Sequence, residues 1–302
     1  MQKILLFLRG MLMGLADTIP GVSGGTIAMI VGIYERLVTA ISHFDVTFLQ
    51  LLFAGRLRDA WKHADVGFVL NLLLGIITGI LLFSVLVLHL LENHLPPTFA
   101  AFFGLILGSV WILYKEMESR KPSTFLAIAI GAAAAWFIVG LDSIQGSEAL
   151  PYVFGCGLVA ICAMILPGIS GSYILLILGE YAIILGKIRK IVHLEAGVQD
   201  YLTLAVFASG CVIGLVGFSK LLKWLLARYH TLTLAVLCGF MLGSLRCLYP
   251  LQKMVVDGDS RHFEMIPFAQ TTPALGAAVA LAFLGGLVFI LVLYRLGKVR
   301  EK

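Results

Sequence analysis

Long apolar segments recur along the whole sequence, and they constrain the fold more than any other feature. The stretches 66–92 and 273–296 are largely apolar, and each reaches the length of about 20 residues with which a helix crosses a bilayer. Of all residues, 60% are hydrophobic and 13% are charged, whereas a soluble domain carries about 25% charged residues. The sequence therefore predicts a polytopic membrane protein and excludes a soluble enzyme, a DNA-binding domain and a secreted disulfide-bonded domain.

We expect every apolar segment to form a helix, because irregular backbone cannot face lipid. The segments lie at 4–16, 24–43, 66–92, 98–116, 123–141, 152–166, 171–188, 201–227, 232–249 and 273–296. The segments 4–16 and 152–166 are short, end in turns rich in glycine and proline, and are followed at once by another apolar segment. This order predicts an all-α fold with two broken, or re-entrant, helix pairs at 4–43 and 152–188.

The sequence also contains an internal repeat. Residues 20–25, Pro-Gly-Val-Ser-Gly-Gly, align with residues 167–172, Pro-Gly-Ile-Ser-Gly-Ser. Segment 75–114 aligns without gaps with segment 210–249, and the identities include several glycines and serines. Lipid-facing leucine and valine raise the identity between unrelated spans, but glycine and serine do not. The sequence therefore predicts two structural repeats within one chain.

Each repeat, 1–146 and 147–302, is expected to hold one re-entrant pair followed by three spans. The spans are 66–92, 98–116 and 123–141 in the first repeat and 201–227, 232–249 and 273–296 in the second. Because three is an odd number, the second repeat enters the membrane from the opposite side if the re-entrant pairs do not cross. This predicts an inverted-topology repeat, the architecture of many secondary transporters.

The distribution of lysine and arginine predicts the orientation. Cytoplasmic loops of membrane proteins are enriched in these residues, and two loops of the first repeat are basic whereas those near 92–97 and 142–150 are not. The basic residues are Arg36, Arg56, Arg58, Lys62, Lys115, Arg120 and Lys121. Both termini are therefore expected in the cytoplasm, and the C-terminal end is also basic, up to Lys302. The second repeat follows the rule less closely, since Lys187, Arg189, Lys190, Lys253 and Arg261 would then face outward.

Two short polar motifs directly follow the proline-glycine turns and open helices. They are Ser23-Gly24-Gly25-Thr26 and Ser170-Gly171-Ser172. Serine at a helix N-cap, with glycine beside it, leaves backbone N–H groups unpaired and sterically open, and each helix start carries a partial charge of about +0.5. In an inverted repeat the broken helices meet near the bilayer midplane. The two motifs are therefore predicted to bind a shared anion such as a phosphate group.

Charged residues inside apolar segments are costly and often functional. Arg9 or Arg246 could supply the cation that a phosphate group needs, while Asp17, Glu35 or Glu180 could carry a coupling proton. Each candidate also has a plainer interpretation. Arg9 could anchor its helix at the interface, Lys220, Lys223 and Arg246 could snorkel to the membrane surface, Asp17 could cap a helix, and Glu35 and Glu180 could end their helices in water.

Glycine pairs at 75/79, 104/108, 210/214 and 239/243 have the spacing by which membrane helices pack closely. We interpret them as packing positions and not as phosphate loops. The histidines and cysteines show no metal-ligand or disulfide spacing. We therefore expect no metal, no cofactor and no nucleic-acid partner; the chain's expected partners are membrane lipids, and a homo-oligomer is left open.

The run from Gly14 to Thr26, which continues to Gly32-Ile33-Tyr34-Glu35, closely resembles the signature of the PopT family of bacterial polyprenyl-phosphate translocases. The second copy, from Leu166 to Ser172 with Gly179-Glu180-Tyr181, is also similar to that family. The resemblance covers nearly the whole chain. It implies a flippase, and not an enzyme, in the bacterial cytoplasmic membrane. Such a protein returns undecaprenyl phosphate from the outer to the inner leaflet, where the carrier is reused for peptidoglycan and other envelope glycans.

Two other functions are compatible with parts of the sequence. The first motif is similar to a stretch of the BacA-type undecaprenyl-diphosphate phosphatases, but Gly24 stands where that family has an arginine. The paired glutamates and the Ser-Ser-Thr-Gly-His stretch of that family are absent, so phosphoryl transfer lacks a nucleophile and a base. A small-anion channel or permease would have similar helix ends, and the sequence alone does not separate it from a lipid transporter.

Overall fold

The computed structural model describes residues 2–19, 22–117, 121–257, 260–267 and 271–300, and most of these are helical. The helices are α1 (Gln2–Asp17), α2 (Gly24–Ile30), α3 (Tyr34–Ser42), α4 (Val46–Phe53), α5 (Leu57–His63), α6 (Val66–Asn93), α7 (Leu95–Glu116), α8 (Pro122–Val139), α9 (Leu150–Ile165), α10 (Gly171–Ile177), α11 (Tyr181–Val192), α12 (Val198–Arg228), α13 (His230–Ser244) and α14 (Pro273–Arg300). Pro20 and Gly21 of the first turn, and the basic residues Arg120 and Lys302, lie outside the described residues.

Five of the described helices, α6, α7, α8, α12 and α14, are long and apolar enough to cross a bilayer. Two bent pairs, α2 with α3 and α10 with α11, meet the same criterion when each pair is taken as one span. Many large apolar side chains of α6, α8, α12 and α14 are exposed on the surface of the chain. Extended apolar surfaces of this kind mark contact with a membrane. The chain is therefore a multi-pass membrane protein.

The sequence predicts one helix over 24–43 and one over 171–188, and both predictions are wrong. Each segment forms two helices, with a bend of 120° between α2 and α3 and of 110° between α10 and α11. Gly32 and Gly179 have φ angles of +72° and +71°, and their N–H groups bond back to the preceding helical turn. This arrangement is a glycine C-cap, which ends a helix. Only glycine adopts that left-handed conformation at low cost.

Further differences from the prediction lie between the spans. Two strands, β1 (Gln252–Asp257) and β2 (Ser260–Met265), pair antiparallel between α13 and α14, so the fold is not strictly all-α. The predicted span 232–249 ends early, because α13 stops at Ser244. Helices α4 and α5 occupy a segment in which no helix is expected, and Asp45 caps α4 by accepting a hydrogen bond from the Phe48 N–H at 3.0 Å. Helices this short escape a search for segments of bilayer length.

The long helices pack in pairs. Helix α1 lies along α6, α9 along α12, α7 along α14, and α8 along α13. Glycines occupy these contacts: a Cβ atom at Gly79 would collide with the backbone of α1, and one at Gly214 would collide with α9. In the same way, Gly104 lies against α14 and Gly239 against α8. The prediction that the glycine pairs serve close helix packing is confirmed.

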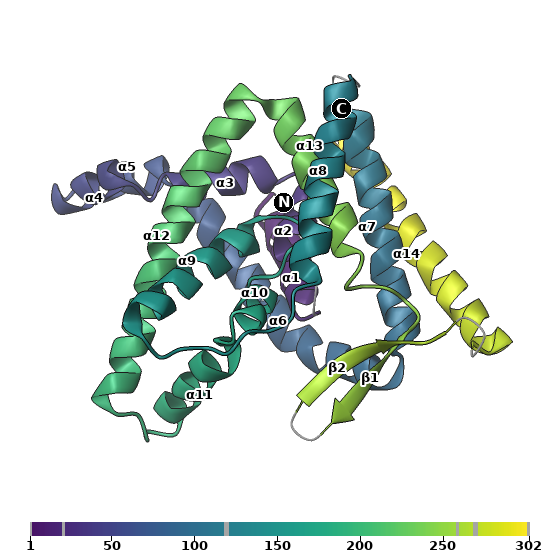
Figure 1. The fold of residues 1–302 in the computed structure, drawn as a ribbon. Coiled ribbons are helices and arrows are strands. Elements are labelled where there is room, and N and C mark those ends of the chain that lie inside the picture. The colour runs from purple at the N-terminus through teal and green to yellow at the C-terminus, as the bar shows by residue number, and fades with distance from the viewer. Residues whose placement is uncertain (1, 20–21, 118–120, 258–259, 268–270, 301–302) are drawn as a thin grey trace.

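Helices α1 and α9 end well inside the length of the spanning helices beside them. Gly79, at the middle of the 28-residue α6, contacts Met11, and α1 ends about 9 Å beyond that contact at a rise of 1.5 Å per residue. Gly214, near the middle of α12, contacts Leu158 of α9 in the same way. In Figure 1, α1, α2 and α10 lie at the centre of the molecule, between α12 on one side and α7 and α14 on the other. The turns that follow α1 and α9 therefore lie inside the membrane-spanning layer.

Candidate functional site

The turn between α1 and α2 contacts the turn between α9 and α10. Ser23 Oγ donates a hydrogen bond to the carbonyl of Met164 at 3.2 Å. In the other direction, the Gly168 N–H donates to Thr26 Oγ1 at 2.8 Å. Ser23 and Thr26 are both buried. Residues of the two polar motifs, far apart in the sequence, therefore belong to one cluster.

The start of α2 is closed by its own neighbours. Asp17 Oδ1 accepts a hydrogen bond from the Gly24 N–H at 2.6 Å, and Ser23 Oγ accepts one from the Gly25 N–H at 3.1 Å. The expectation of unpaired N–H groups is therefore wrong for these two glycines. A carboxylate is the group that a helix start attracts most strongly. Asp17 thus occupies the position that a bound anion would take at α2.

The start of α10 is open. Ser170 makes no side-chain cap, and its Oγ lies 2.8 Å from Ser172 Oγ. No described acceptor pairs with the N–H groups of Gly171 and Ser172. Met164 occupies the place that aligns with Asp17, so this turn lacks the carboxylate of the first. Ser172 is exposed and Ser170 is half-buried, whereas Gly171 between them is buried, so this helix start is accessible at its two serines.

Of the two candidate cations, Arg246 lies at the end of α8, beside Gly140. Its Nη1 donates to the carbonyl of Trp136 at 3.0 Å, and its guanidinium lies 5.1 Å from the centre of the Trp136 ring. The hydroxyl of Tyr173, from the first turn of α10, donates to the carbonyl of Val139 at the same end of α8, at 2.6 Å. Arg9 is half-buried on α1, and it lies about 12 Å before Asp17 along the helix axis at the usual rise.

The candidate proton carriers differ in their surroundings. Glu35 is exposed, and its Oε1 lies 2.9 Å from Nε2 of His230, on α13. Glu180 is fully buried: Oε1 accepts a hydrogen bond from the Ser147 N–H at 2.9 Å, while Oε2 has no partner among the described residues. The interpretation that Glu180 ends its helix in water is therefore wrong. Two of the three acidic candidates, Asp17 and Glu180, bind backbone N–H groups.

Sequence reasoning missed the role of a tyrosine at the centre of the site. The buried hydroxyl of Tyr34 donates to the carbonyl of Ile165 at 3.1 Å, which fixes α3 to the end of α9. The internal repeat aligns Tyr34 with Tyr181. The alignment could have indicated this role, because a tyrosine that both repeats share after a shared glycine is not typical of lipid-facing residues.

Sequence reasoning also missed a polar cluster where α3 packs against α12. Lys223 Nζ lies 2.7 Å from His43 Nε2, and the His43 ring stacks on the His63 ring at 4.8 Å between centroids. His63 Nε2 in turn lies 3.1 Å from Asp45 Oδ1. Burial and the nearby Lys223 ammonium hold the pKa of His43 below its usual value. This cluster joins an element of the first half of the chain to one of the second half.

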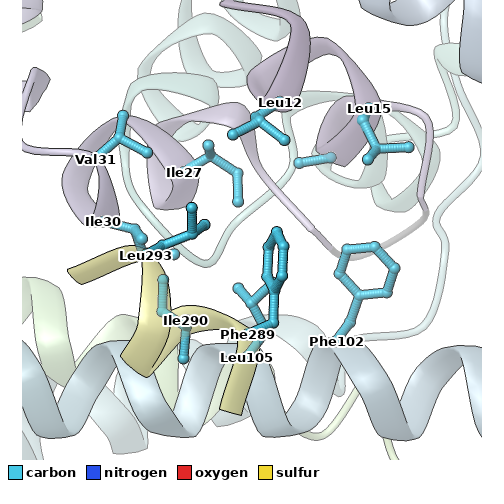
Figure 2. Close-up of a pocket in the computed structure, with 11 residues that line it drawn as sticks. Leu12, Leu15, Ile27, Ile30, Val31, Phe102, Leu105, Phe289, Ile290 and Leu293 are labelled. Atoms are coloured by element: carbon cyan, nitrogen blue, oxygen red, sulfur yellow. The ribbon is translucent and has the colours of Figure 1, made fainter. Parts of the chain in front are cut away.

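An apolar cavity of about 150 Å³ lies beside the first turn. Figure 2 shows side chains of α1, α2, α7 and α14 around it, among them Leu12, Ile27, Phe102 and Phe289. Carbon atoms form nearly all of its lining. Such a cavity fits a hydrocarbon chain and not an ion.

Comparison with protein families assigns the chain. Residues 13–266 match the family model described as undecaprenyl phosphate translocase-like. The chain belongs to this family. It is also 40% identical to a polyprenyl-phosphate transporter of Vibrio cholerae serotype O1, over 89% of this chain and 85% of that protein.

A second relative is a polyprenyl-phosphate transporter of Staphylococcus aureus, which is 30% identical over 80% of this chain and 85% of that protein. No solved structure gives a significant match. Membership of the family rests on most of the chain and includes both polar motifs.

Proposed function

We propose that this chain is a flippase that moves undecaprenyl phosphate from the outer to the inner leaflet of the bacterial cytoplasmic membrane, for reuse in envelope synthesis. The family and the names of the two relatives support the substrate class. The observation that carries the proposal is the contact between two polar turns inside the membrane-spanning layer, one of which has an open helix start. A polar slot at that depth lowers the cost of moving a charged head group, while the lipid chain stays in hydrocarbon.

The proposed architecture is an inverted repeat of residues 1–146 and 147–302. Its support is the pairing of helices. The pair α1 and α6 has a counterpart in α9 and α12, and the pair α7 and α14 has a counterpart in α13 and α8. Each pair has glycines at corresponding contacts. The loops next to α3, α5 and the end of α7 are basic, so we place this side and both termini in the cytoplasm.

The proposed phosphate site is the start of α10, formed by Ser170, Gly171 and Ser172, with Arg246 as its cation. One helix start contributes about +0.5 charge, and the guanidinium contributes one full charge, against about −1.5 to −2 on a phosphate monoester. The first motif, Ser23 to Thr26, would form the opposite wall. The apolar cavity beside the first turn has a lining suited to the isoprenoid chain of the same lipid.

We propose that Glu180 is the acidic residue that couples transport to protons. Its fully buried Oε2 has no partner among the described residues, and a buried carboxylate oxygen is costly without one. Glu35 is exposed and contacts His230, and Asp17 serves as the cap of α2. In liposomes with an imposed pH gradient, Glu180→Gln should remove the effect of the gradient on transport, while Glu35→Gln should keep it. A gradient effect that survives Glu180→Gln would reject this residue.

The proposal of alternating access rests on a difference between the two halves. Helix α3 packs against α12, with Lys223 close to His43 and His230 close to Glu35. The corresponding helices α11 and α6 make at most a marginal contact among the described residues. Figure 1 shows α3 and α11 near opposite ends of α12. We infer that the cytoplasmic side is closed in this conformation and that the site opens toward the outer leaflet.

The test is transport in liposomes that contain the purified chain and undecaprenyl phosphate, with the leaflet of the phosphate group as the readout. The double variant Ser170→Ala with Ser172→Ala should slow transport strongly. Ser209→Ala is the matched control, because Ser209 is an exposed serine of α12 whose one hydrogen bond among the described residues is to its own helix. Unchanged transport by the double variant would place the site elsewhere. Release of phosphate from undecaprenyl diphosphate would favour the enzyme, and flux of inorganic phosphate would favour the channel.

A further inference from the structure

Tyr34 and Tyr181 occupy equivalent places in the two bent helix pairs but have opposite surroundings. Each tyrosine is the first residue of its helix, α3 or α11, and each follows a glycine cap by two residues. Tyr34 is 3% exposed and donates to the carbonyl of Ile165 at the end of α9. Tyr181 is 41% exposed, and no described residue forms a hydrogen bond with its hydroxyl. Of these two equivalent tyrosines, Tyr34 therefore has a hydrogen-bonded hydroxyl, whereas the hydroxyl of Tyr181 has no partner among the described residues.

The serines of the two turns differ in the same way. Ser23 donates across to the carbonyl of Met164, at the end of α9. Ser170, which aligns with Ser23, instead bonds to Ser172 within its own turn. The bent pair α2–α3 is thus fixed to the other half of the chain by two side chains, whereas α10–α11 uses neither equivalent contact.

The two bent pairs also differ in how they pack against a long helix, α14 for α2 and α8 for α10. Beside α2, the space toward α14 is the apolar cavity of about 150 Å³ shown in Figure 2. Beside α10, the residues Ile174 and Ile177, which align with Ile27 and Ile30 of the cavity lining, belong to one buried cluster with Ala135 of α8. The hydroxyl of Tyr173, also of α10, donates to the carbonyl of Val139 of α8 at 2.6 Å. The two bent pairs therefore occupy different positions: α2–α3 is bonded to the end of α9, whereas α10–α11 is bonded to α8.

The acceptor for the second arrangement is already present. Thr18 aligns with Ile165, whose carbonyl accepts the Tyr34 bond. Thr18 directly follows α1, and Ile165 is the last residue of α9. No described donor contacts the Thr18 carbonyl oxygen. A shift of α10–α11 toward α1 would therefore let Tyr181 make the bond that Tyr34 makes now.

We propose that Tyr34 and Tyr181 are alternating latches, positioning residues that hold the chain in one of two conformations. In the described conformation Tyr34 bonds to the Ile165 carbonyl. In the opposite conformation Tyr34 is released, and Tyr181 bonds to the Thr18 carbonyl. The latch deepens the transport function proposed above, since it supplies the two states that a carrier needs. Its existence is tested without any transport measurement.

The test is hydrogen–deuterium exchange of the full chain in lipid nanodiscs, read out separately for residues 34–42 and 181–192. Tyr181→Phe is the decisive variant, because its hydroxyl has no described partner and its loss leaves the described contacts intact. The variant weakens only the opposite conformation, so exchange in 34–42, far along the chain, should slow about two- to tenfold, the effect of one hydrogen bond. Tyr34→Phe should do the reverse and speed exchange in 34–42 while slowing it in 181–192.

A purely structural role predicts a different pattern. Each substitution would then change exchange only around its own tyrosine, and that result would overturn the latch. The double variant provides an internal control, because the two effects oppose each other and should bring exchange in 34–42 back toward the wild-type rate. If the chain proved inactive in transport but showed these opposite shifts, the latch would stand and the proposed function would fall.

Discussion

Removing the carboxylate of Asp17 should destabilise the chain by about 1.5–3 kcal/mol, the usual value for a hydrogen bond to a charged group. The bond from the Gly24 N–H to Asp17 Oδ1 is short, at 2.6 Å, and it caps the seven-residue helix α2. Asp17→Ala leaves that N–H without its partner. Unfolding in mixed detergent micelles with a chemical denaturant measures the cost as a change in the free energy of unfolding.

The same contact makes a sharper prediction through Gly24. A Cβ atom at this position would lie 2.7 Å from Asp17 Oδ2 and 3.0 Å from Oδ1, so Gly24→Ala must push the carboxylate away. Overpacking of this kind costs about 1–3 kcal/mol. In the Asp17→Ala background the clash is absent. The double variant should therefore cost little more than Asp17→Ala alone, whereas additivity within about 0.5 kcal/mol would refute this account of the turn.

Three other predictions concern packing, charge and pH. Gly79→Ala should destabilise the chain by about 1–3 kcal/mol, because the added Cβ meets the backbone of α1. The control Gly217→Ala, with open space around it, should be neutral or stabilising by up to about 1 kcal/mol. Unfolding with a chemical denaturant measures both changes. Arg246→Ala should weaken undecaprenyl phosphate binding more than Arg9→Ala does, as measured by titration in nanodiscs, and equal losses would contradict the proposed site. His43 has a folded pKa below its usual 6.5, so the open or unfolded chain takes up the proton more readily, and the contact of α3 with α12 should weaken as the pH falls below about 6.5. The expected readout is a smaller protection factor for hydrogen exchange in α3 at pH 5 than at pH 7, with each rate divided by the intrinsic rate at its own pH.

The sequence was sufficient for five of the six predicted spans and for the contact positions between them. A span needs about 20 largely apolar residues in a row, and such segments can be read directly from the sequence. Glycine recurring at the spacing of one helical turn indicates a close helix contact, and the structure places Gly79 and Gly214 at such contacts. The breaks at Gly32 and Gly179 were missed, although both glycines were visible in the repeat. A glycine in an apolar run is compatible with either packing or a cap, and only the backbone conformation separates the two.

The contact between the two motifs was also predictable from the repeat, and the structure shows it. The repeat could not show that the two motifs differ. Asp17 closes the start of α2, while the aligned Met164 leaves the start of α10 open. Which tyrosine is buried depends on the conformation of the whole chain and not on local sequence, because Tyr34 and Tyr181 follow equivalent glycine caps.

The most direct test of the central claim is an experimental structure of the chain with bound undecaprenyl phosphate. The account predicts density for the phosphate group within hydrogen-bond distance of the N–H groups of Gly171 and Ser172, with the Arg246 guanidinium turned toward it. A head group bound at the basic loops, with Ser170 to Ser172 still occupied only by their own contacts, would contradict it.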